Sequence, residues 1–371
     1  MKAFSVFVIG FSTLLLGSVV FAEEPSLKDV TLYATGGAYL TPAFTPVQQD
    51  YTVTVNSDIA EAQIVALTAA ADNTFTINDQ AVASGAAYTA KLEVGSNVYA
   101  LQVTAPDGAA KTYTITITKE DIKPVADKFL KLTYTDAETG QTMPYRLFVP
   151  EKYDAQQTYP LVLFLHGGGE RGDDNEKQIL ANQGATIWAK PDEQAKRPCF
   201  VLAPQAHNAP DGGFGITRDA ENKLSLKRVF EFSPDLKLAV KTLEKVLAEY
   251  SIDNTRIYAT GLSQGGFGVW NLGATYPDVF AAIVPICGGV DPALAGKLAS
   301  KPIWAFHAAE DPIIPVSYSR NSISAIRNAG GNPRYTEYAS GTYLKPMEHF
   351  SWALAYQTVE MREWLFNQKK P

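Results

Sequence analysis

Cysteine and histidine are both scarce in this sequence of 371 residues, which holds two cysteines and four histidines. The cysteines form no CxxC pair and the histidines do not cluster with them, so we expect no metal site. Lysine and arginine are not gathered into a basic run, and the formal net charge is −7. This acidic balance disfavours nucleic acid and anionic membrane surfaces as partners.

The two cysteines, Cys199 and Cys287, do not fit a disulfide. Cys199 opens one predicted strand, whereas Cys287 closes another. If these strands are parallel, the two residues lie at opposite edges of the sheet, farther apart than a disulfide can span. The sequence therefore predicts two buried free thiols.

The first 22 residues have the pattern of a signal peptide. Lys2 supplies a positive charge, Phe4 to Leu16 form an apolar core, and Val20-Phe21-Ala22 is a small-x-small cleavage site. The apolar run is shorter than a membrane-spanning helix requires. We therefore expect export to the periplasm or the medium, with cleavage after residue 22 and no integral membrane anchor.

Residues 23–121 have the pattern of an all-β domain. Asp50 to Val55 and Tyr113 to Thr118 alternate apolar and polar residues with period two, as one-sided strands do. Turn signals such as Val94-Gly95-Ser96-Asn97 and Pro106-Asp107-Gly108 separate the runs. Short strands at this spacing, without a helical stretch, predict an immunoglobulin-like sandwich.

The same stretch resembles the cadherin-like β-sandwich module of bacterial surface and secreted proteins. The resemblance rests on Leu40 to Phe44, Tyr51 to Val53, Val94 to Asn97 and Lys111 to Thr116, and it covers nearly the whole domain. It implies either a spacer that packs against its neighbour or a module that binds carbohydrate or substrate. No catalytic group is apparent in it.

A linker at residues 122–127 precedes a second pattern over residues 128–371, in which strands alternate with helices. Phe129 to Thr135 and Met143 to Val149 form a predicted hairpin. The alternation that follows predicts a doubly wound, mostly parallel α/β sheet of the α/β-hydrolase type. Its short apolar runs predict strands buried on both faces: Leu161–Leu165, Phe200–Ala203, Arg256–Thr260, Ala281–Ile286, Ile303–His307 and Arg334–Tyr338. The predicted helices are Glu176–Ala189, Pro234–Tyr250, Ser263–Tyr276, Val316–Asn328 and Ser351–Gln368.

A nucleophile motif lies at one strand-to-helix junction of this pattern. The apolar run ending at Thr260 stops at Gly261-Leu262-Ser263-Gln264-Gly265, and a helix-compatible segment follows. A Gly-x-Ser-x-Gly turn in this context lifts the serine hydroxyl above the sheet edge, where a side chain in place of either glycine would clash. Ser263 is therefore the predicted nucleophile.

Chain order selects the partners of Ser263, because an α/β-hydrolase places its acid and then its histidine after the serine. Only His349 follows the last predicted strand, so it is the predicted base. Asp311, after the strand that ends at His307, is the preferred acid, because ligands gather at the carboxyl edge of such a sheet. Asp291, after the preceding strand, is the alternative acid.

Two backbone amides are expected to bind the oxyanion of the tetrahedral intermediate. One is the N–H of Gln264, directly after the nucleophile. The other belongs to the glycine-rich loop that follows the first parallel strand, with Gly168 as first choice and Gly169 as second. A phosphate-binding loop is the competing interpretation, but neither of the usual glycine motifs for phosphate or dinucleotides is present.

These motifs together resemble the secreted α/β-hydrolase esterases similar to feruloyl and acetylxylan esterases and poly(3-hydroxybutyrate) depolymerases. The resemblance covers residues 128–371, and it implies Ser263, Asp311 and His349 as the triad. This sequence departs from the family pattern in one place, the long run Ala339 to Glu348 before the histidine. The motifs that carry it are Leu165–Gly172, Ala203–Gln205, Gly261–Gly266, Pro285–Gly289 and His349–Trp352.

Four further residues are candidates for contact with the substrate. His166 and Gly169 belong to the glycine-rich loop, while Trp352 lies three residues beyond His349. Trp270 either walls an acyl pocket or packs its helix against the sheet. The insert Asn208 to Phe232 either covers the cleft or is an ordinary surface loop.

The sequence therefore predicts an exported serine esterase that needs no cofactor. Feruloyl or acetyl esters of plant polysaccharide are the substrates that the resemblance implies. A polyester depolymerase with the same triad is the alternative, and a non-catalytic glycan-binding or adhesion protein is the alternative from another class. Nothing in the sequence indicates an oligomeric state.

Overall fold

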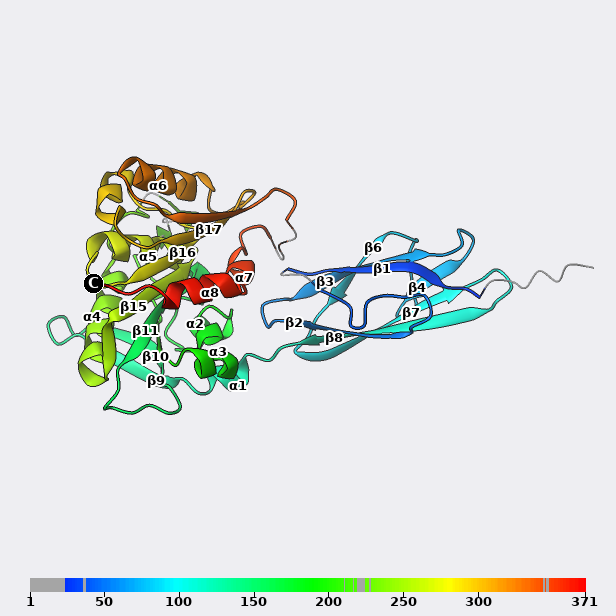
Figure 1. Ribbon diagram of the computed structural model, residues 1–371, viewed down its shortest axis with the longest axis horizontal. Helices are drawn as coiled ribbons and strands as arrows, with labels where there is room; N and C mark the ends of the chain where they lie inside the picture. Colours follow the sequence, from blue (N-terminus) through cyan, green and yellow to red (C-terminus); the bar gives the residue numbers. More distant parts are fainter. Residues whose placement is uncertain are drawn as a thin grey trace, which may run out of the picture.

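The computed structural model describes residues 24–35, 38–209, 211–215, 217–218, 224–226, 228–342, 344 and 347–371. The predicted signal peptide at residues 1–22 lies outside the described residues. The described chain forms an all-β body and an α/β body that lie end to end (Figure 1).

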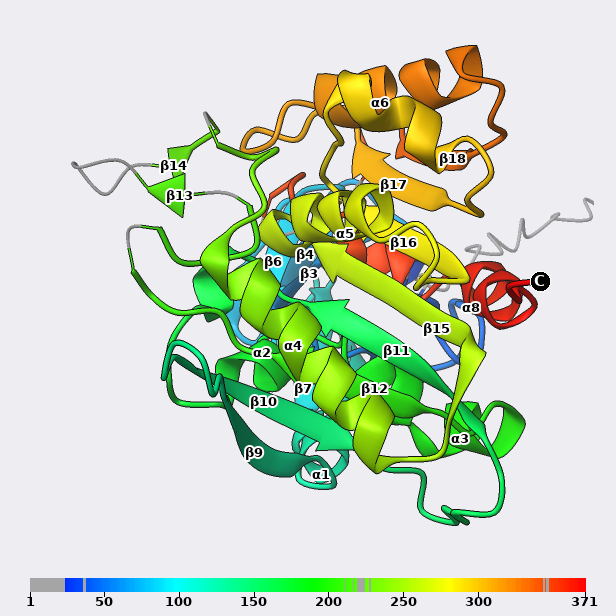
Figure 2. The same ribbon diagram turned by 90° about the vertical axis from the view of Figure 1, so that its left-hand side faces the viewer.

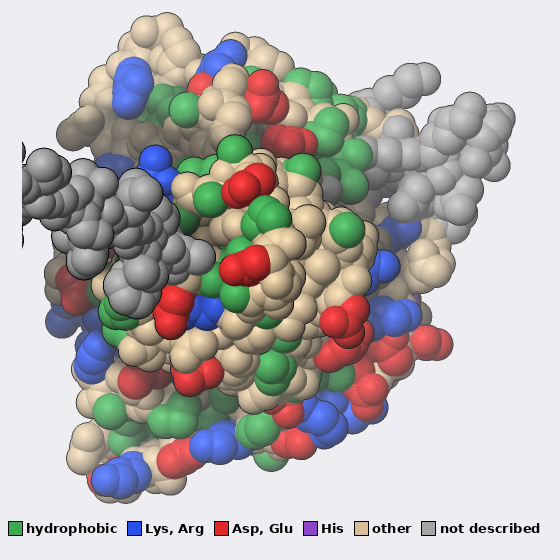
Figure 3. Space-filling view, turned by 90° about the vertical axis from the view of Figure 1, so that its right-hand side faces the viewer, with side chains coloured by type: hydrophobic (Ala, Val, Ile, Leu, Met, Phe, Trp, Pro, Cys, Tyr) green, Lys and Arg blue, Asp and Glu red, His purple; other side chains and the backbone are tan. Residues whose placement is uncertain are grey.

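The all-β body is a sandwich of two sheets, as the sequence predicts. One sheet has the order β1-β3-β6 and the other the order β2-β8-β7-β4-β5. In β2 every second side chain is buried, which confirms the one-sided pattern of its sequence. Seen from its free end, the visible part of the described surface carries acidic and basic side chains interspersed with apolar ones (Figure 3). The strands are β1 (Leu27–Tyr33), β2 (Asp50–Val55), β3 (Glu61–Thr68), β4 (Thr74–Ile77), β5 (Gln80–Ala81), β6 (Ala87–Lys91), β7 (Gly95–Thr104) and β8 (Ala110–Lys119).

The α/β body is built on an eight-stranded sheet of order β18-β17-β16-β15-β11-β12-β10-β9. The strands from β12 to β18 pair in parallel, and β9 and β10 form the predicted antiparallel hairpin at one edge. This topology confirms the doubly wound α/β class. The strands are β9 (Leu130–Thr135), β10 (Thr142–Phe148), β11 (Tyr159–Leu165), β12 (Phe200–Pro204), β15 (Ile252–Leu262), β16 (Ala282–Ile286), β17 (Trp304–Ala308) and β18 (Arg334–Tyr338).

Helices cover both faces of this sheet (Figure 2). On one face α4 (Pro234–Glu249), α5 (Gln264–Thr275) and α6 (Ser317–Asn328) pack against the sheet and share one apolar core. The other face carries a second core with α1, α2, α7 and α8. The remaining elements are α1 (Lys123–Ala126), η1 (Gly168–Glu170), α2 (Lys177–Leu180), η2 (Thr186–Ala189), α3 (Pro191–Lys196), β13 (Thr217–Arg218), β14 (Leu224–Ser225), η3 (Pro292–Leu298), α7 (Trp352–Ala355) and α8 (Val359–Phe366). Among the described residues, no helix is both long and apolar enough to cross a membrane.

The predicted helix Glu176–Ala189 is wrong, because the structure divides it into α2 and η2. Asn182 forms a turn in which its Oδ1 accepts a hydrogen bond of 2.9 Å from the N–H of Gly184. The chain also approaches the sheet so closely that a Cβ at Gly184 would lie 2.3 Å from the ring of Phe164. The chain therefore leaves the helical path at residues 182–184, between α2 and η2.

Two other sequence predictions need correction. The predicted helix Ser351–Gln368 is interrupted between α7 and α8, where Thr358 has an extended backbone. The predicted β18 is present but is not buried on both faces, since it forms the edge of the sheet and its side chains are partly exposed. A short α1 also occupies most of the predicted linker at residues 122–127.

The sandwich contacts the α/β body through the helical layer that contains α2 and η2. Oδ1 of Asp58 in the sandwich accepts a hydrogen bond of 2.9 Å from the N–H of Gln183. Nζ of Lys190 lies 2.7 Å from Oε2 of Glu120. A cavity of about 280 Å³ lies between the two bodies at this contact. The two bodies thus interact directly, in addition to their covalent connection.

Candidate active site

Ser263 occupies a sharp turn between β15 and α5. Its backbone has φ 54° and ψ −117°, a left-handed conformation that side chains rarely adopt. A Cβ at Gly261 would lie 2.6 Å from the carbonyl oxygen of Leu165, and a Cβ at Gly265 only 2.0 Å from the same atom. The two glycines of the motif are therefore required for the strand and helix to approach this closely, which leaves Ser263 at the carboxyl edge of the sheet.

The structure brings Ser263, His349 and Asp311 into one hydrogen-bonded row. Nε2 of His349 lies 2.9 Å from Oγ of Ser263, and its Nδ1 lies 2.7 Å from Oδ2 of Asp311. Since a carboxylate accepts, Nδ1 carries the proton and Nε2 is left to accept one from the serine. Ser263 is 9% exposed and His349 7%, so the row is shielded but reachable.

Asp311 is held as a carboxylate by several donors. Its Oδ1 accepts from the N–H groups of Ile313 (2.9 Å) and Ile314 (2.8 Å), directly after β17. Burial alone raises the pKa of Asp311, but hydrogen bonds from His307, His349 and the backbone outweigh it and hold this pKa well below its usual range. The alternative acid, Asp291, instead accepts from the N–H of Ala293 at the start of η3.

The glycine-rich loop after β11 forms η1 and lies beside Ser263. Nε of Arg171 donates to the carbonyl oxygen of Gly168 at 3.1 Å, and its Nη1 donates to that of Ala209 at 3.1 Å. Because the C=O and N–H of a trans peptide point in opposite directions, the N–H of Gly169 points away from Arg171. Gly168 and Gly169 both line the cavity at Ser263. The N–H of Gln264 is the first of α5.

A cavity of about 190 Å³ opens beside the serine. Trp352 is 6% exposed and its ring lies edge-on to His349, with 5.0 Å between the centroids. Burial raises the pKa of the Glu170 carboxyl at the loop side. The cavity is thus partly aromatic and partly polar. Its lining comprises Gly167, Gly168, Gly169, Glu170, Ala181, Asn182, Leu262, Ser263, His349, Phe350 and Trp352.

His166 is not at this cavity, contrary to its candidacy as a substrate contact. It is fully buried, and its Nε2 accepts a hydrogen bond of 2.9 Å from the N–H of Ala206. Its Nδ1 therefore carries the proton and donates to the carbonyl oxygen of Gly167 at 2.6 Å. Burial lowers the pKa of His166 to about 4. This neutral imidazole stabilises the glycine-rich loop through its hydrogen bond to Gly167.

Trp270 is also removed from the cavity. It is fully buried among the apolar side chains that α4, α5 and α6 pack against the sheet. The face of α5 that carries Trp270 is thus directed into the core, and the helix-packing interpretation holds. Of the four candidate contacts, Gly169 and Trp352 line the cavity.

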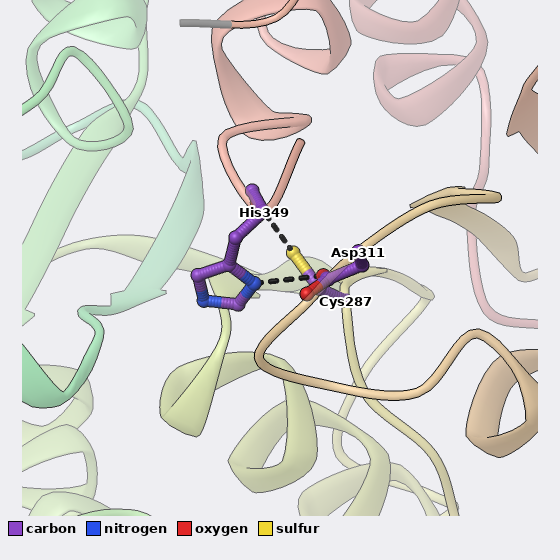
Figure 4. A group of neighbouring side chains, drawn as sticks. All are labelled: Cys287, Asp311 and His349. Atoms are coloured by element: carbon purple, nitrogen blue, oxygen red, sulfur yellow. Dashed lines mark hydrogen bonds and ion pairs between the residues drawn. The ribbon is translucent and has the colours of Figure 1, made fainter. Parts of the chain in front are cut away.

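A buried thiol lies next to the triad. Cys287, Asp311 and His349 offer atoms within 4.8 Å of one another, the one such group among the described residues that is spaced to hold a metal ion (Figure 4). Burial raises the pKa of Cys287, so the protonated thiol is favoured over the thiolate that a metal binds. Its Sγ instead lies 3.3 Å from Oγ of Ser351. Both cysteines are free and buried, which confirms that prediction.

Sequence reasoning missed several residues of the site. His307 was noted only as the end of a strand, and its Nε2 lies 3.3 Å from Oδ2 of Asp311. Asn182 carries no signal, because the sequence pattern predicts that this residue lies in the middle of a helix. Phe350 lies within the motif His349–Trp352 that carries the resemblance, and this position directly after His349 is the signal that could have found it.

Comparisons with known proteins agree with the two bodies. Residues 27–120 match the model of the cadherin-like β-sandwich domain, and residues 137–334 match the model of the Esterase family. A solved structure described as a thermostable esterase is 38% identical, covers 76% of this chain and 74% of its own, and has a TM-score of 0.62.

Two curated relatives match shorter stretches. Poly(3-hydroxyalkanoate) depolymerase C of Paucimonas lemoignei is 40% identical over 138 residues, which are 35% of this chain and 28% of the relative. Probable feruloyl esterase C of Aspergillus niger is 24% identical over 171 residues, which are 46% of this chain and 56% of the relative. This chain therefore spans about a quarter to just over half of the length of these relatives.

Proposed function

Because this chain belongs to the Esterase family, we propose that it hydrolyses carboxylic esters through a Ser263–His349–Asp311 triad. The observation that carries the proposal is the position of His349, hydrogen-bonded to Ser263 through Nε2 and to Asp311 through Nδ1. A serine hydroxyl is a poor nucleophile until a base accepts its proton, and that base needs an orienting partner. This arrangement meets both requirements.

The reaction follows from the donors and acceptors of the site. Oγ of Ser263 attacks the ester carbonyl while Nε2 of His349 takes the hydroxyl proton, and the carbonyl electron pair moves to its oxygen. The N–H of Gln264, together with that of Gly168 or Gly169, stabilises this oxyanion. The intermediate then collapses and the bond between the carbonyl carbon and the alcohol oxygen breaks, while His349 gives its proton to that oxygen. The acyl group remains on Ser263.

Water completes the cycle by the same route. His349 takes a proton from water, whose oxygen attacks the acyl carbonyl and forms a second oxyanion. Collapse of this intermediate returns the proton to Ser263 and releases the carboxylic acid. Asp311, whose low pKa keeps it ionised, stabilises the imidazolium that forms twice in each turnover.

The favoured substrates are feruloyl or acetyl esters of plant polysaccharide, as the resemblance to feruloyl esterases suggests. The aromatic wall formed by Phe350 and Trp352 supports an aromatic acyl group. A polyester depolymerase is the second candidate, supported by the 40% identity to the Paucimonas lemoignei enzyme. A glycan-binding or adhesion role without catalysis is the third, and a complete triad argues against it.

We also propose that residues 1–22 serve as a signal peptide and that the mature protein works in the periplasm or the medium. Residues 23–121 form the sandwich domain, 122–127 the linker and 128–371 the catalytic domain.

Hydrolysis of p-nitrophenyl acetate, butyrate and octanoate and of methyl ferulate, by wild type and Ser263→Ala, tests the proposal. We expect the variant to lose about 10⁴-fold or more in kcat, with an unchanged circular dichroism spectrum. Ser317→Ala, at an exposed position on α6, is the matched control and should keep wild-type rates. Equal rates in wild type and Ser263→Ala, or hydrolysis of no ester, would contradict the proposal. Release of acid from an insoluble polyester film in preference to methyl ferulate would select the depolymerase.

A further inference from the structure

The segment between α2 and η2 links the cavity to the sandwich. Ala181 and Asn182 line the cavity beside Ser263, and the next residue, Gln183, donates its N–H to Asp58 of the sandwich. One short turn therefore contacts both the cavity, through Asn182, and the sandwich, through the adjacent Gln183.

Asn182 lines the cavity and carries a buried hydrogen-bond donor that has no protein acceptor. The residue is 3% exposed, and its Oδ1 already accepts from the N–H of Gly184 at 2.9 Å, which fixes the orientation of the amide. Its Nδ2 is buried and has no hydrogen-bond partner. An unsatisfied buried donor costs about 1–3 kcal/mol, and here it belongs to a residue that lines the cavity, which points to an acceptor that arrives with the ligand.

We propose that Nδ2 of Asn182 donates a hydrogen bond to a second oxygen of the acyl group, beyond the reacting carbonyl, and that Asp58 of the sandwich holds Asn182 in place. This inference rests on the proposed esterase function. The substrate class is esters of hydroxylated or methoxylated acids, aliphatic or aromatic.

The size of the cavity favours the acyl group over the alcohol as its occupant. About 190 Å³ accommodates one small group, whereas an alcohol that belongs to a polymer must continue out to solvent. Phe350 and Trp352 supply the apolar walls, and Asn182 supplies a polar group that fixes orientation. A site of this kind gains its specificity from the polar contact, because a substrate without the second oxygen leaves the donor unpaired.

Asp58 acts on Asn182 through the backbone of Gln183. Besides the hydrogen bond that Gln183 donates to Asp58, the turn is held by Nε1 of Trp188, which donates to the carbonyl oxygen of Gly184 at 2.9 Å. The ring of Phe164 prevents a side chain at Gly184, so the turn lies flat against the sheet. The sandwich thus supplies one of the hydrogen bonds that hold this turn. In this interpretation Asp58 is a positioning residue and the sandwich is more than a spacer.

Matched pairs of esters test the role of Asn182. The pairs are p-nitrophenyl 3-hydroxybutyrate with p-nitrophenyl butyrate, and methyl ferulate with methyl cinnamate. Asn182→Asp keeps the acceptor for the N–H of Gly184 but removes the donor, while Asn182→Ala removes both. The quantity compared is kcat/KM for the ester with the second oxygen, divided by kcat/KM for its partner. For at least one pair, we expect both variants to lower this ratio by about 10- to 100-fold. Unchanged ratios in both variants would overturn the inference.

The role of Asp58 is tested with the same ratio. Asp58→Leu removes the acceptor for Gln183 and should lower the ratio, whereas Asp58→Asn retains an acceptor oxygen and should restore it. If Asp58→Leu leaves the ratio at the wild-type value, the proposal that Asp58 of the sandwich holds Asn182 in place is wrong. If Ser263→Ala abolishes hydrolysis but the Asn182 variants keep the ratio, this inference alone fails. If Ser263→Ala still hydrolyses the esters, the proposed function fails, and the inference fails with it.

Discussion

Nε2 of His307 lies 3.3 Å from Oδ2 of Asp311, so a second imidazole contacts the carboxylate that orients His349. His307 is fully buried, and its Nε2 also lies 3.0 Å from the carbonyl oxygen of Ile314. Because both neighbours of Nε2 accept hydrogen bonds, this nitrogen carries a proton. Nδ1 of His307 lies 2.8 Å from Oγ of Ser319 on α6, which fixes the ring.

Replacing His307 by leucine should lower kcat while leaving KM nearly unchanged. The change removes a hydrogen bond to a charged group, worth about 1.5–3 kcal/mol, which corresponds to roughly 10- to 150-fold in rate if the loss falls on the transition state. The pKa of Asp311 should rise at the same time. Steady-state kinetics over a range of pH, with thermal unfolding as a check on folding, would detect both effects. An unchanged kcat in a folded variant would show that Asp311 needs no support from His307.

Replacing Arg171 by lysine should reduce kcat by about 10-fold. The guanidinium donates to the carbonyl oxygens of Gly168 and Ala209 with separate nitrogens, which a single ammonium group cannot reproduce. The glycine-rich loop would then lose its fixed orientation toward the oxyanion. The diagnostic measurement is the split between kcat and KM. A rise in KM alone would mean that the loop binds substrate without stabilising the transition state.

Asp58 should make stability depend on pH. Burial raises its pKa from 3.8 to about 7, although hydrogen bonds from Gln183 and Ser57 and the charge of Lys190 oppose the rise. Between about pH 4 and pH 7 the folded protein keeps this proton while the unfolded chain loses it, so the contribution of Asp58 to stability falls as pH rises. Above pH 7 the loss is complete.

The variant Asp58→Asn removes this titration and keeps the hydrogen bond to Gln183. We therefore expect the variant and the wild type to have equal free energies of unfolding near pH 4. At pH 8 the variant should be more stable by about 1–3 kcal/mol, which is less than the full pKa shift would give because solvent screens part of the charge. Thermal unfolding of both proteins at the two pH values gives the comparison. The neighbouring pair Lys190–Glu120 is present in both proteins, so it cancels in the difference. A difference that does not vary with pH would contradict the assigned pKa.

The two thiols should be unreactive in the folded protein. Burial raises the pKa of Cys199 to about 12 and also raises that of Cys287, and both side chains are shielded from solvent. Reaction with a thiol reagent requires an accessible thiolate. Titration with Ellman's reagent should detect no thiol in native buffer and two thiols in concentrated urea. Detection of no thiol in urea would mean a disulfide, and rapid reaction in native buffer would mean that one site is open.

The hydrogen-bonded arrangement of Ser263, His349 and Asp311 was predictable because it depends on a local motif and on the order of residues along the chain. Ser263 lies in a motif whose glycines are required by contacts with the neighbouring strand, and His349 is the one histidine that follows the last strand. The central strands were predictable because burial on both faces demands continuous apolar runs. The choice between Asp311 and Asp291 rested on position in the sheet, and the geometry brings Asp311 to His349.

What the sequence did not reveal depends on contacts between distant segments. Asn182 reaches the cavity because the chain leaves the helical path next to Gly184, where the backbone packs closely against the ring of Phe164 in β11. The support that His307 gives to Asp311 depends on a ring orientation set by Ser319 of α6. The contact between Asp58 and Gln183 joins residues 125 positions apart in the chain, and no local pattern encodes such a pairing.

Residues 368–370 are hydrogen-bonded to β15. The N–H of Lys370 donates to the carbonyl oxygen of Thr255 at 2.9 Å, and the hydroxyl of Tyr258 donates to that of Gln368 at 2.8 Å. Ser263 lies just beyond the C-terminal end of the same strand, about 26 Å from Thr255 at the usual rise per residue. A solid support coupled at residues 368–370 would therefore attach to the α/β body at the end of β15 opposite Ser263, away from the cavity.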